Sequence, residues 1–148
     1  DYTKSQINIQ KTLKEWGYVR TVISPRETTA EEMTAFVEDL WTNVHVSDVE
    51  SEIIKGYLAE YTSGDDSRIG VIRAEMSEDV LFYSKRGSLA AGRVIVAELA
   101  VIEFEDRAYI LSLFGYPNLG ENLPTYDELE ATMEDAAWII WEAIQETP

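Results

Sequence analysis

Four consecutive residues near the middle of the chain have the types and spacing to bind an anionic substrate. Lys85, Arg86, Gly87 and Ser88 follow a run rich in β-forming residues that begins at Val80. A lysine ammonium at the end of a strand can attract a carboxylate, and a glycine lets a substrate backbone lie close to the strand. The alternative is that Lys85 and Arg86 protect an exposed sheet edge against aggregation.

Three further residues are candidates for chemistry. Glu98 shares a predicted strand face with apolar residues, so it is either a carboxylate of a functional site, an edge residue that limits aggregation, or a partner of Arg93 or Arg107. Tyr2 is a candidate for proton transfer, and a frayed terminal residue is its alternative. His45 is the single histidine; we expect a solvated or locally hydrogen-bonded imidazole there and assign it no function.

The composition limits the partners and cofactors. Acidic residues number 28 against 12 basic ones, and the net charge of -16 repels phosphate backbones, so no nucleic-acid partner is expected. The absence of cysteine and the single histidine exclude thiolate and histidine-rich metal sites, and we expect no metal and no cofactor. No apolar run is long enough to span a membrane. A chain of 148 residues with 45% hydrophobic content suits a single domain, 1–148.

The elements that position these residues are predicted from hydrophobic periodicity. In the first part of the chain, helices are expected near residues 5–16, 30–42 and 48–61, with a short helix at 69–74. The second and third begin at capping-box patterns, Thr29 with Glu32 and Ser47 with Glu50. The side chains of the third helix that are predicted to face inward are Val49, Ile53, Tyr57 and Leu58.

The rest of the chain is predicted to form strands and one long helix. Strands are expected at 80–85, 94–104 and 107–114, with a tight turn at Glu105 and Asp106. Thr125 and Glu128 cap a final helix that ends near Gln145. Its predicted core face consists of Leu129, Met133, Ala136, Ile140 and Ile144, with Trp138 and Trp141 as packing or interface residues. The fold class is therefore α+β: helices, a three-stranded antiparallel meander and a long C-terminal helix.

With these elements in order, the chain resembles the C-terminal part of the serine β-lactamase and penicillin-binding-protein-like family, especially its class A-like serine hydrolases. The resemblance covers nearly all 148 residues. It rests on the helix start at 25–33, the turn at 66–69, the segment 83–89, the hairpin and the closing helix. It implies that the single domain lacks the N-terminal strands and the nucleophile helix of the family fold.

The resemblance implies roles for the four central residues. The family has Lys-Thr-Gly or Lys-Ser-Gly on this strand; its lysine helps to bind the substrate carboxylate and to tune proton transfer, and the N–H after the glycine is an oxyanion-hole donor. Lys85 takes the lysine role, Gly87 allows close approach, and the amide of Ser88 is the donor. Arg86 departs from the pattern, because it replaces a small hydroxyl residue that would contact the carboxylate. Carboxylate binding is therefore either rebuilt around a guanidinium or lost.

The resemblance also implies a nucleophile that this sequence does not contain. Such enzymes need Ser-x-x-Lys, and that spacing occurs nowhere among the 148 residues. Family order would place the motif before residue 1, and it would place Tyr2 where a hydroxyl shuttles a proton to the leaving nitrogen. Residues 17–28 contain no Glu-x-x-Leu-Asn, so the water-activating glutamate of class A enzymes has no counterpart.

The expected function is part of a serine acyl-enzyme hydrolase that acts on β-lactams or D-alanyl peptides, and the chain alone is predicted to be inactive. The alternative is a non-catalytic binding or scaffold protein on a degenerate fold of this kind. The expected partner is the N-terminal half of the fold, as a separate or cleaved polypeptide, or a second copy of the chain. The missing elements would leave exposed both an edge of the strand at 107–114 and a patch with Trp138 and Trp141. The resemblance implies a periplasmic or other extracytoplasmic location.

Overall fold

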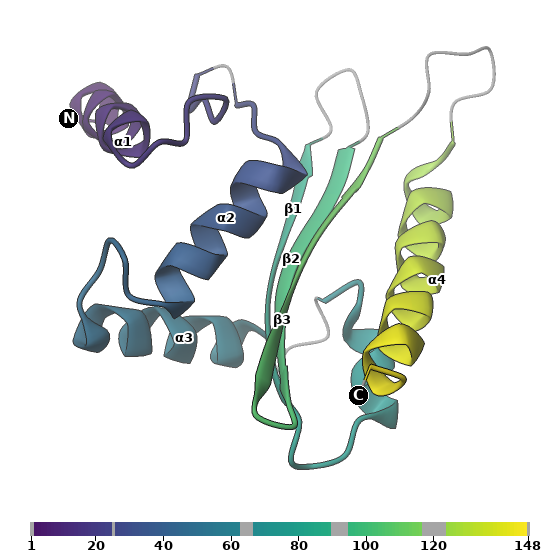
Figure 1. Ribbon diagram of the computed structural model, residues 1–148. Helices are drawn as coiled ribbons and strands as arrows, with labels where there is room; N and C mark the ends of the chain where they lie inside the picture. Colours follow the sequence, from purple (N-terminus) through teal and green to yellow (C-terminus); the bar gives the residue numbers. More distant parts are fainter. Residues whose placement is uncertain (1, 25, 63–66, 90–94, 117–123, 148) are drawn as a thin grey trace. The chain divides into compact units, whose positions relative to one another are not determined.

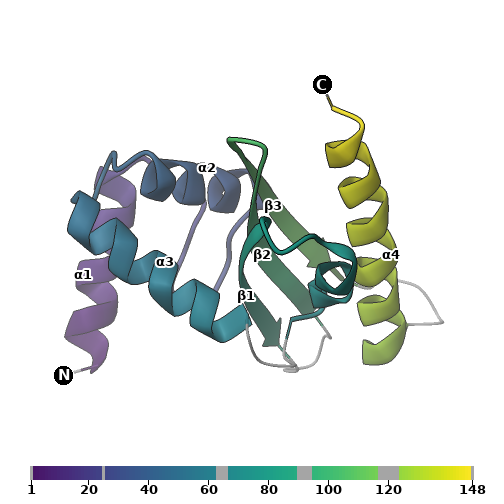
Figure 2. The same ribbon diagram turned by 90° about the horizontal axis from the view of Figure 1, so that it is seen from below.

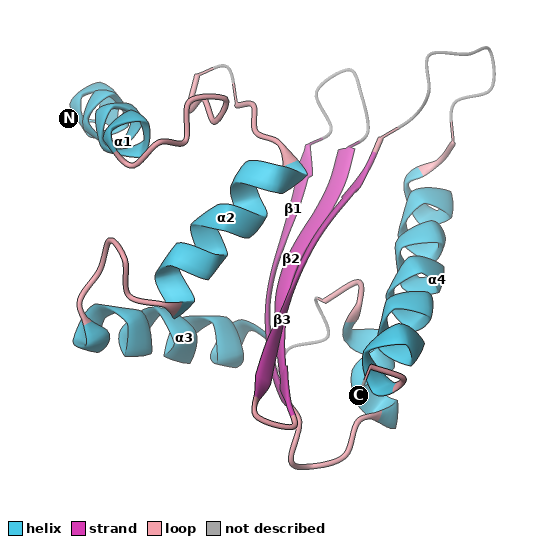
Figure 3. Cartoon of the chain, in the orientation of Figure 1, coloured by secondary structure: helices cyan, strands magenta, loops and turns pink. Residues whose placement is uncertain are grey.

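The computed structural model describes residues 2–24, 26–62, 67–89, 95–116 and 124–147 and contains helices and one antiparallel sheet (Figure 1, Figure 3). In chain order the elements are α1 (Tyr2–Glu15), α2 (Ala30–Trp41), α3 (Asp48–Thr62), the 3₁₀ helix η1 (Gly70–Glu75), β1 (Leu81–Leu89), β2 (Ile95–Phe104), β3 (Arg107–Gly115) and α4 (Tyr126–Gln145). This order confirms the predicted α+β class, with helices followed by a three-stranded meander and a long final helix. In the described part of the chain, no helix has the length and apolar character of a membrane span.

Two helices begin at reciprocal capping boxes. At α4, the backbone N–H of Thr125 donates to Glu128 at 2.7 Å, and the backbone N–H of Glu128 donates to the Thr125 hydroxyl at 3.3 Å. At α3, the same two bonds join Ser47 and Glu50 at 2.9 and 3.3 Å. Each box satisfies N–H groups that the first turn of a helix leaves without a partner. Both predicted helix starts are therefore confirmed.

The start of α2 uses only half of its predicted capping box. The Thr29 hydroxyl accepts a bond from the backbone N–H of Glu32 at 3.1 Å. The Glu32 carboxylate instead accepts from the backbone N–H of Arg20 at 2.8 Å and from the Thr21 hydroxyl at 2.7 Å. The glutamate therefore ties the preceding loop to the helix.

The chain divides into two compact units, Asp1–Glu52 and Ile53–Pro148, and the boundary falls within α3. In the first unit, Val37 and Leu40 of α2 are buried. The buried hydroxyl of Ser51 donates to the Leu40 carbonyl at 3.0 Å and so joins α3 to the end of α2. Whether the two units fold as the single domain expected from the sequence stays a prediction.

The exposed stripe of α3 corrects one sequence prediction. Val49, Ile53 and Tyr57 were expected to face inward, but they are 70%, 53% and 68% exposed. The side chain buried at this helix is Ser51, because its hydroxyl satisfies a carbonyl at the end of α2. Apolar spacing alone did not identify the packed side of this helix.

The sheet lies in the second unit and has the strand order β1-β2-β3. The central strand β2 pairs antiparallel with both neighbours, and each outer strand has β2 as its only strand partner in the described part of the chain. Glu105 and Asp106 connect β2 to β3 with φ angles of 51° and 62°. Two left-handed residues make the tight turn whose twist matches a hairpin, so the predicted turn is confirmed.

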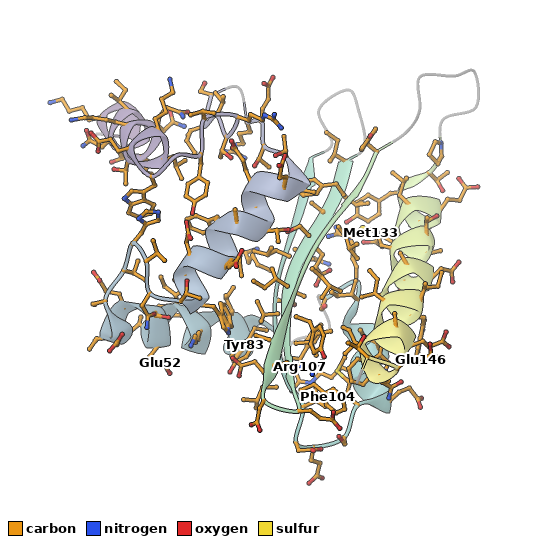
Figure 4. The ribbon with its side chains drawn as sticks, viewed as in Figure 1. Glu52, Tyr83, Phe104, Arg107, Met133 and Glu146 are labelled. Atoms are coloured by element: carbon orange, nitrogen blue, oxygen red, sulfur yellow. The ribbon has the colours of Figure 1, made fainter. Side chains whose placement is uncertain are left out.

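One face of the sheet carries the main core, and it packs against η1 and α4 (Figure 1, Figure 2). The buried members of this core are Ile69, Ile72, Phe82, Ala100, Ile102, Leu111, Ala137, Trp141 and Ile144. Toward the start of α4, Met133 joins Leu129 and Val96 in a second buried cluster (Figure 4). The sheet, η1 and α4 are therefore held together by contiguous apolar packing.

The buried face of α4 differs from the predicted one at two positions. Ala137 and Trp141 are buried, whereas Ala136 and Ile140 are only half-buried. The four-residue steps that begin at Leu129 therefore continue along the helix, in keeping with side chains that lie above one another at i and i+4.

The prediction that Trp141 lies in an exposed patch is wrong. Trp141 is 3% exposed, and its ring packs edge-on against Phe104 with the centroids 5.6 Å apart. Trp138 is half-buried and also packs against the core. Both tryptophans therefore act as packing residues within the second unit.

Candidate functional site

The four central residues lie within an edge strand. β1 continues to Leu89, so Lys85 to Ser88 are paired along β2 and do not form the end of the strand that the sequence predicted. Their partners are Leu99 for Lys85, Glu98 for Arg86, Ala97 for Gly87 and Val96 for Ser88. Pairing on one side only leaves the other side of β1 facing away from β2.

Lys85 and Gly87 share one face of β1 and are both exposed. The lysine Nζ donates to the carbonyl of Arg86 at 2.8 Å. The space beside Gly87 is open, because a Cβ at this position would meet no atom within 4 Å. An ammonium and an uncovered stretch of backbone therefore lie two residues apart.

Arg86 lies on the other face of β1, opposite Glu98 in the pairing with β2. The arginine is half-buried, and Glu98 is only 2% exposed. Lys85 and Arg86 therefore project to opposite faces of the sheet. The structure brings Lys85, Gly87 and the backbone of Ser88 along one edge, with Arg86 turned toward the core face.

The partners of Glu98 differ from those expected. Its carboxylate accepts bonds from the Ser67 hydroxyl at 2.5 Å and from the backbone N–H of Arg68 at 2.7 Å. Arg107 pairs with Phe104 at the other end of β2, and Arg93 lies outside the described residues. Because β2 is the central strand, Glu98 is also no edge residue. It holds the loop before η1 against the sheet.

Arg68 is a buried cation that the sequence did not mark as functional. Its side chain is 2% exposed, and its Nε donates to Glu130 at 2.7 Å. Its Nη1 donates to two carbonyl oxygens, that of Gly87 at 3.3 Å and that of Ala97 at 3.2 Å. Its Nη2 donates to the Tyr126 hydroxyl. The guanidinium thus joins the loop before η1, both strands of the β1–β2 pair and the first turns of α4.

The signal for Arg68 was weak because its partners are distant in the sequence. Arg68 belongs to the turn at 66–69 that contributed to the family resemblance, but no local spacing relates it to Gly87 or Glu130. A buried arginine is stable only where its donors and its charge find partners. In the described part of the chain, no buried side-chain nitrogen or oxygen lacks a hydrogen-bond partner.

The first unit contains a second cluster of titratable side chains. The Tyr18 hydroxyl donates to Asp39, and the same carboxylate lies 3.2 Å from Nε2 of His45. The imidazole stacks on Trp16, with ring centroids 4.7 Å apart. Burial, followed by the hydrogen bond to Asp39, raises the pKa of Tyr18 well above its ordinary value. The expected locally bonded imidazole is confirmed, and its partner is Asp39.

Tyr2 is the first residue of α1, and the structure does not place its side chain among the described ones. No described group of three or more histidine, aspartate or glutamate side chains is arranged to hold a metal ion. The features assembled at β1 are an ammonium, an accessible glycine backbone and a backbone N–H. These features can bind and orient an anionic acyl compound, and none of them is a nucleophile with an adjacent base.

Comparison with known proteins extends this description. The sequence model of the Beta-lactamase enzyme family matches residues 5–144. Among solved structures, an ancestral class A beta-lactamase (GNCA) superposes with a TM-score of 0.72 and 19% identity, over 93% of this chain and 55% of that one. A beta lactamase from Xanthomonas campestris pv. campestris strain ATCC 33913 superposes with a TM-score of 0.63 and 20% identity, over 91% of this chain and 54% of that one.

These solved structures share the fold, and the chain spans about half of their length. No curated protein sequence matches it significantly. The comparisons agree with the helix, meander and helix order that the elements display.

Proposed function

The chain belongs to the beta-lactamase enzyme family, and from that premise we propose that it supplies the substrate-binding strand of a serine acyl-enzyme hydrolase that acts on β-lactams or D-alanyl peptides. One observation carries the proposal. Lys85 and Gly87 lie exposed on the same face of an edge strand, with open space beside the glycine.

Each part of the strand has a proposed task. The ammonium of Lys85 attracts the carboxylate of the substrate and takes part in proton transfer. Gly87 lets the acyl group approach the backbone, because no side chain fills the space there. The N–H of Ser88 then donates to the oxygen that becomes negative when the carbonyl is attacked.

Arg86 has a proposed task that departs from the family triplet. We propose that its guanidinium takes over the carboxylate contact of the small hydroxyl residue found elsewhere in the family. Its position on the core face requires the side chain to reach around the strand edge. Arg86→Thr restores the family triplet and is expected to change the affinity for an anionic β-lactam. Equal affinities of the two proteins would remove Arg86 from the proposed site.

The nucleophile is proposed to come from a segment outside this sequence. No Ser-x-x-Lys occurs in the 148 residues, and the solved relatives are about twice as long as the region that they share with this chain. We propose that the N-terminal half of the fold, as a separate or cleaved polypeptide, completes the site. The isolated chain is accordingly expected to show no hydrolysis of a chromogenic cephalosporin.

The outer side of β3 supports the proposed association. The strand has one strand neighbour in the described part of the chain, and a cavity of about 490 Å³ runs beside it. The lining is Ala108, Tyr109, Ile110, Leu111, Ser112, Leu113, Ile140 and Ile144. An apolar edge of this kind offers backbone pairing and side-chain packing to an added strand.

Self-association through the same edge is the alternative arrangement. We expect light scattering to give a mass above 16.8 kDa, or a stable complex with an added N-terminal fragment. A monodisperse 16.8 kDa monomer that ignores such a fragment would contradict both arrangements.

The proposed function is tested by binding of benzylpenicillin to the ¹⁵N-labelled chain. We expect the amide signals of residues 85–88 to shift, and Lys85→Met to weaken binding at least about tenfold, because a hydrogen bond to a charged group contributes about 1.5–3 kcal/mol. The matched control is Lys14→Met, which removes an exposed lysine of α1 and should leave the affinity unchanged. Shifts confined to other residues, or equal losses in both variants, would contradict the proposal. Absence of binding at millimolar ligand would favour the non-catalytic alternative.

A further inference from the structure

The buried guanidinium of Arg68 lies against one particular peptide group. The peptide that joins Gly87 to Ser88 contains the Gly87 carbonyl, which accepts from Nη1 of Arg68 at 3.3 Å. The same peptide contains the Ser88 N–H, which is the proposed oxyanion donor. Arg68 therefore contacts one end of the dipole whose other end would meet the substrate.

The direction of that N–H follows from the strand pairing. Gly87 and Ala97 are directly opposite each other, and Nη1 of Arg68 reaches both of their carbonyl oxygens, at 3.3 and 3.2 Å. Two carbonyls that one nitrogen can reach must both lie between the strands. In a planar trans peptide the C=O and the N–H point in opposite directions. The Ser88 N–H therefore points away from β2, to the outer side of β1.

We propose that Arg68 is a positioning residue that orients and polarises the Gly87–Ser88 peptide, so that the Ser88 N–H is a fixed and strengthened hydrogen-bond donor. This inference rests on the proposed function of β1. A cation at the carbonyl draws electron density along the amide and makes its N–H a better donor, since hydrogen bonds in series strengthen each other. The effect is large where water is excluded, and the Arg68 side chain is 2% exposed.

The surroundings of Arg68 hold the guanidinium in one place. Glu130 of α4 binds its Nε, and Tyr126 binds its Nη2 and stacks near it, with 5.4 Å from the guanidinium carbon to the ring centroid. On the loop side, Glu98 binds the Arg68 backbone N–H and the Ser67 hydroxyl. These contacts from a helix, a loop and a strand fix the cation relative to the sheet, as an orienting group requires.

The test compares Arg68→Met, Arg68→Lys and the control Arg107→Met by NMR on the whole chain. Arg107 is an exposed arginine of the same sheet. In Arg68→Met we expect the Ser88 amide proton to move upfield, because its donor strength falls, and its hydrogen exchange to accelerate. Arg68→Lys keeps the charge without the two-carbonyl geometry, so it should show the same changes to a smaller extent. Arg107→Met should leave this signal in place.

Benzylpenicillin binding then separates this inference from the proposed function. If the chain binds it, Arg68→Met should weaken the affinity about tenfold, below the 10²–10³-fold effect of deleting an oxyanion donor. If the parent chain does not bind it but the Ser88 signal depends on Arg68 as expected, the proposed function fails and the positioning role stands. If Arg68→Met does not fold, Arg68→Lys decides. An unchanged Ser88 amide in a folded Arg68 variant would overturn the inference.

Discussion

The two units each contain a cluster of polar side chains around a carboxylate, and the two clusters are built differently. In the first unit, Asp39 meets a phenol and an imidazole, those of Tyr18 and His45, both of which change protonation with pH. In the second unit, Glu98 meets a backbone N–H and a serine hydroxyl, beside a guanidinium that stays charged at every accessible pH.

The difference indicates what each cluster contributes. A fully buried network with a permanent cation fixes geometry over a wide pH range, as a strand that orients a substrate requires. A half-buried carboxylate with titratable partners gives stability that depends on pH. The second unit, which carries the proposed site, therefore has the more rigid of the two clusters.

Removing Glu98 is expected to give the largest effect and to break this comparison directly. Glu98→Ala leaves the Ser67 hydroxyl and the Arg68 backbone N–H without their buried acceptor. Each such loss costs about 1–3 kcal/mol, so we expect the free energy of unfolding to fall by about 3 kcal/mol or more. Urea unfolding followed by tryptophan fluorescence measures it.

The control for this change is Glu134→Ala, which removes an exposed carboxylate of α4. Surface substitutions of this kind usually alter stability by less than about 0.5 kcal/mol. A loss from Glu98→Ala as small as that of the control would show that the buried cluster does not stabilise the second unit.

The alkaline limb of stability sharpens the comparison through Tyr18. Its pKa is raised in the folded state by burial and by the hydrogen bond to Asp39. The unfolded chain therefore loses this proton first, at about pH 10, and stability falls as the pH rises further. Tyr18→Phe should be less stable than the parent chain at pH 8, and the difference should shrink between about pH 10 and 11. Urea midpoints at several pH values test this.

Tyr57→Phe serves as the control, because Tyr57 is 68% exposed. Its stability should follow that of the parent chain throughout the alkaline range. A difference between Tyr18→Phe and the parent chain that stays constant with pH would contradict the assignment of this alkaline loss to Tyr18.

The smallest expected effect comes from a device that the two halves of the chain share. Backbone and hydroxyl bonds from Ser47 lower the pKa of Glu50, and those from Thr125 lower the pKa of Glu128. The stability that each carboxylate adds is present above about pH 4.3 and is lost as the pH falls through the lowered folded value. Glu50→Gln and Glu128→Gln should each flatten the acid limb slightly and to a similar extent. Unequal slopes would show that the caps, as well as the buried clusters, differ between the units.

Local patterns in the sequence were sufficient to predict the element order. Capping residues such as Thr125 and the turn at Glu105 and Asp106 act within a few positions, so their geometry follows from neighbouring residues. Inward faces were predicted less well. The stripe at Val49, Ile53 and Tyr57 has helical spacing and is exposed, because burial depends on the element that covers a face.

The candidate site was predictable only where its residues are contiguous. Lys85 to Ser88 are adjacent, and their strand forms from local β propensity, so the exposed edge could be found from the sequence. The support beneath it could not, since Arg68 meets Gly87, Ala97 and Glu130 only after the sheet and α4 have packed. The partners of Glu98 were mispredicted for the same reason.

The meander also has a consequence for how the second unit folds. Each strand pairs with the strand next to it in the sequence, and the β2–β3 connection is only two residues long. Pairing therefore closes short loops, whose entropic cost is low, and the sheet has a small contact order. We expect the β2–β3 hairpin to form early, with α4 docking onto an existing surface. The contacts of Arg68 that span the loop, the strands and α4 would then be among the last to form, so the substrate-facing peptide becomes ordered only when folding of this unit is nearly complete.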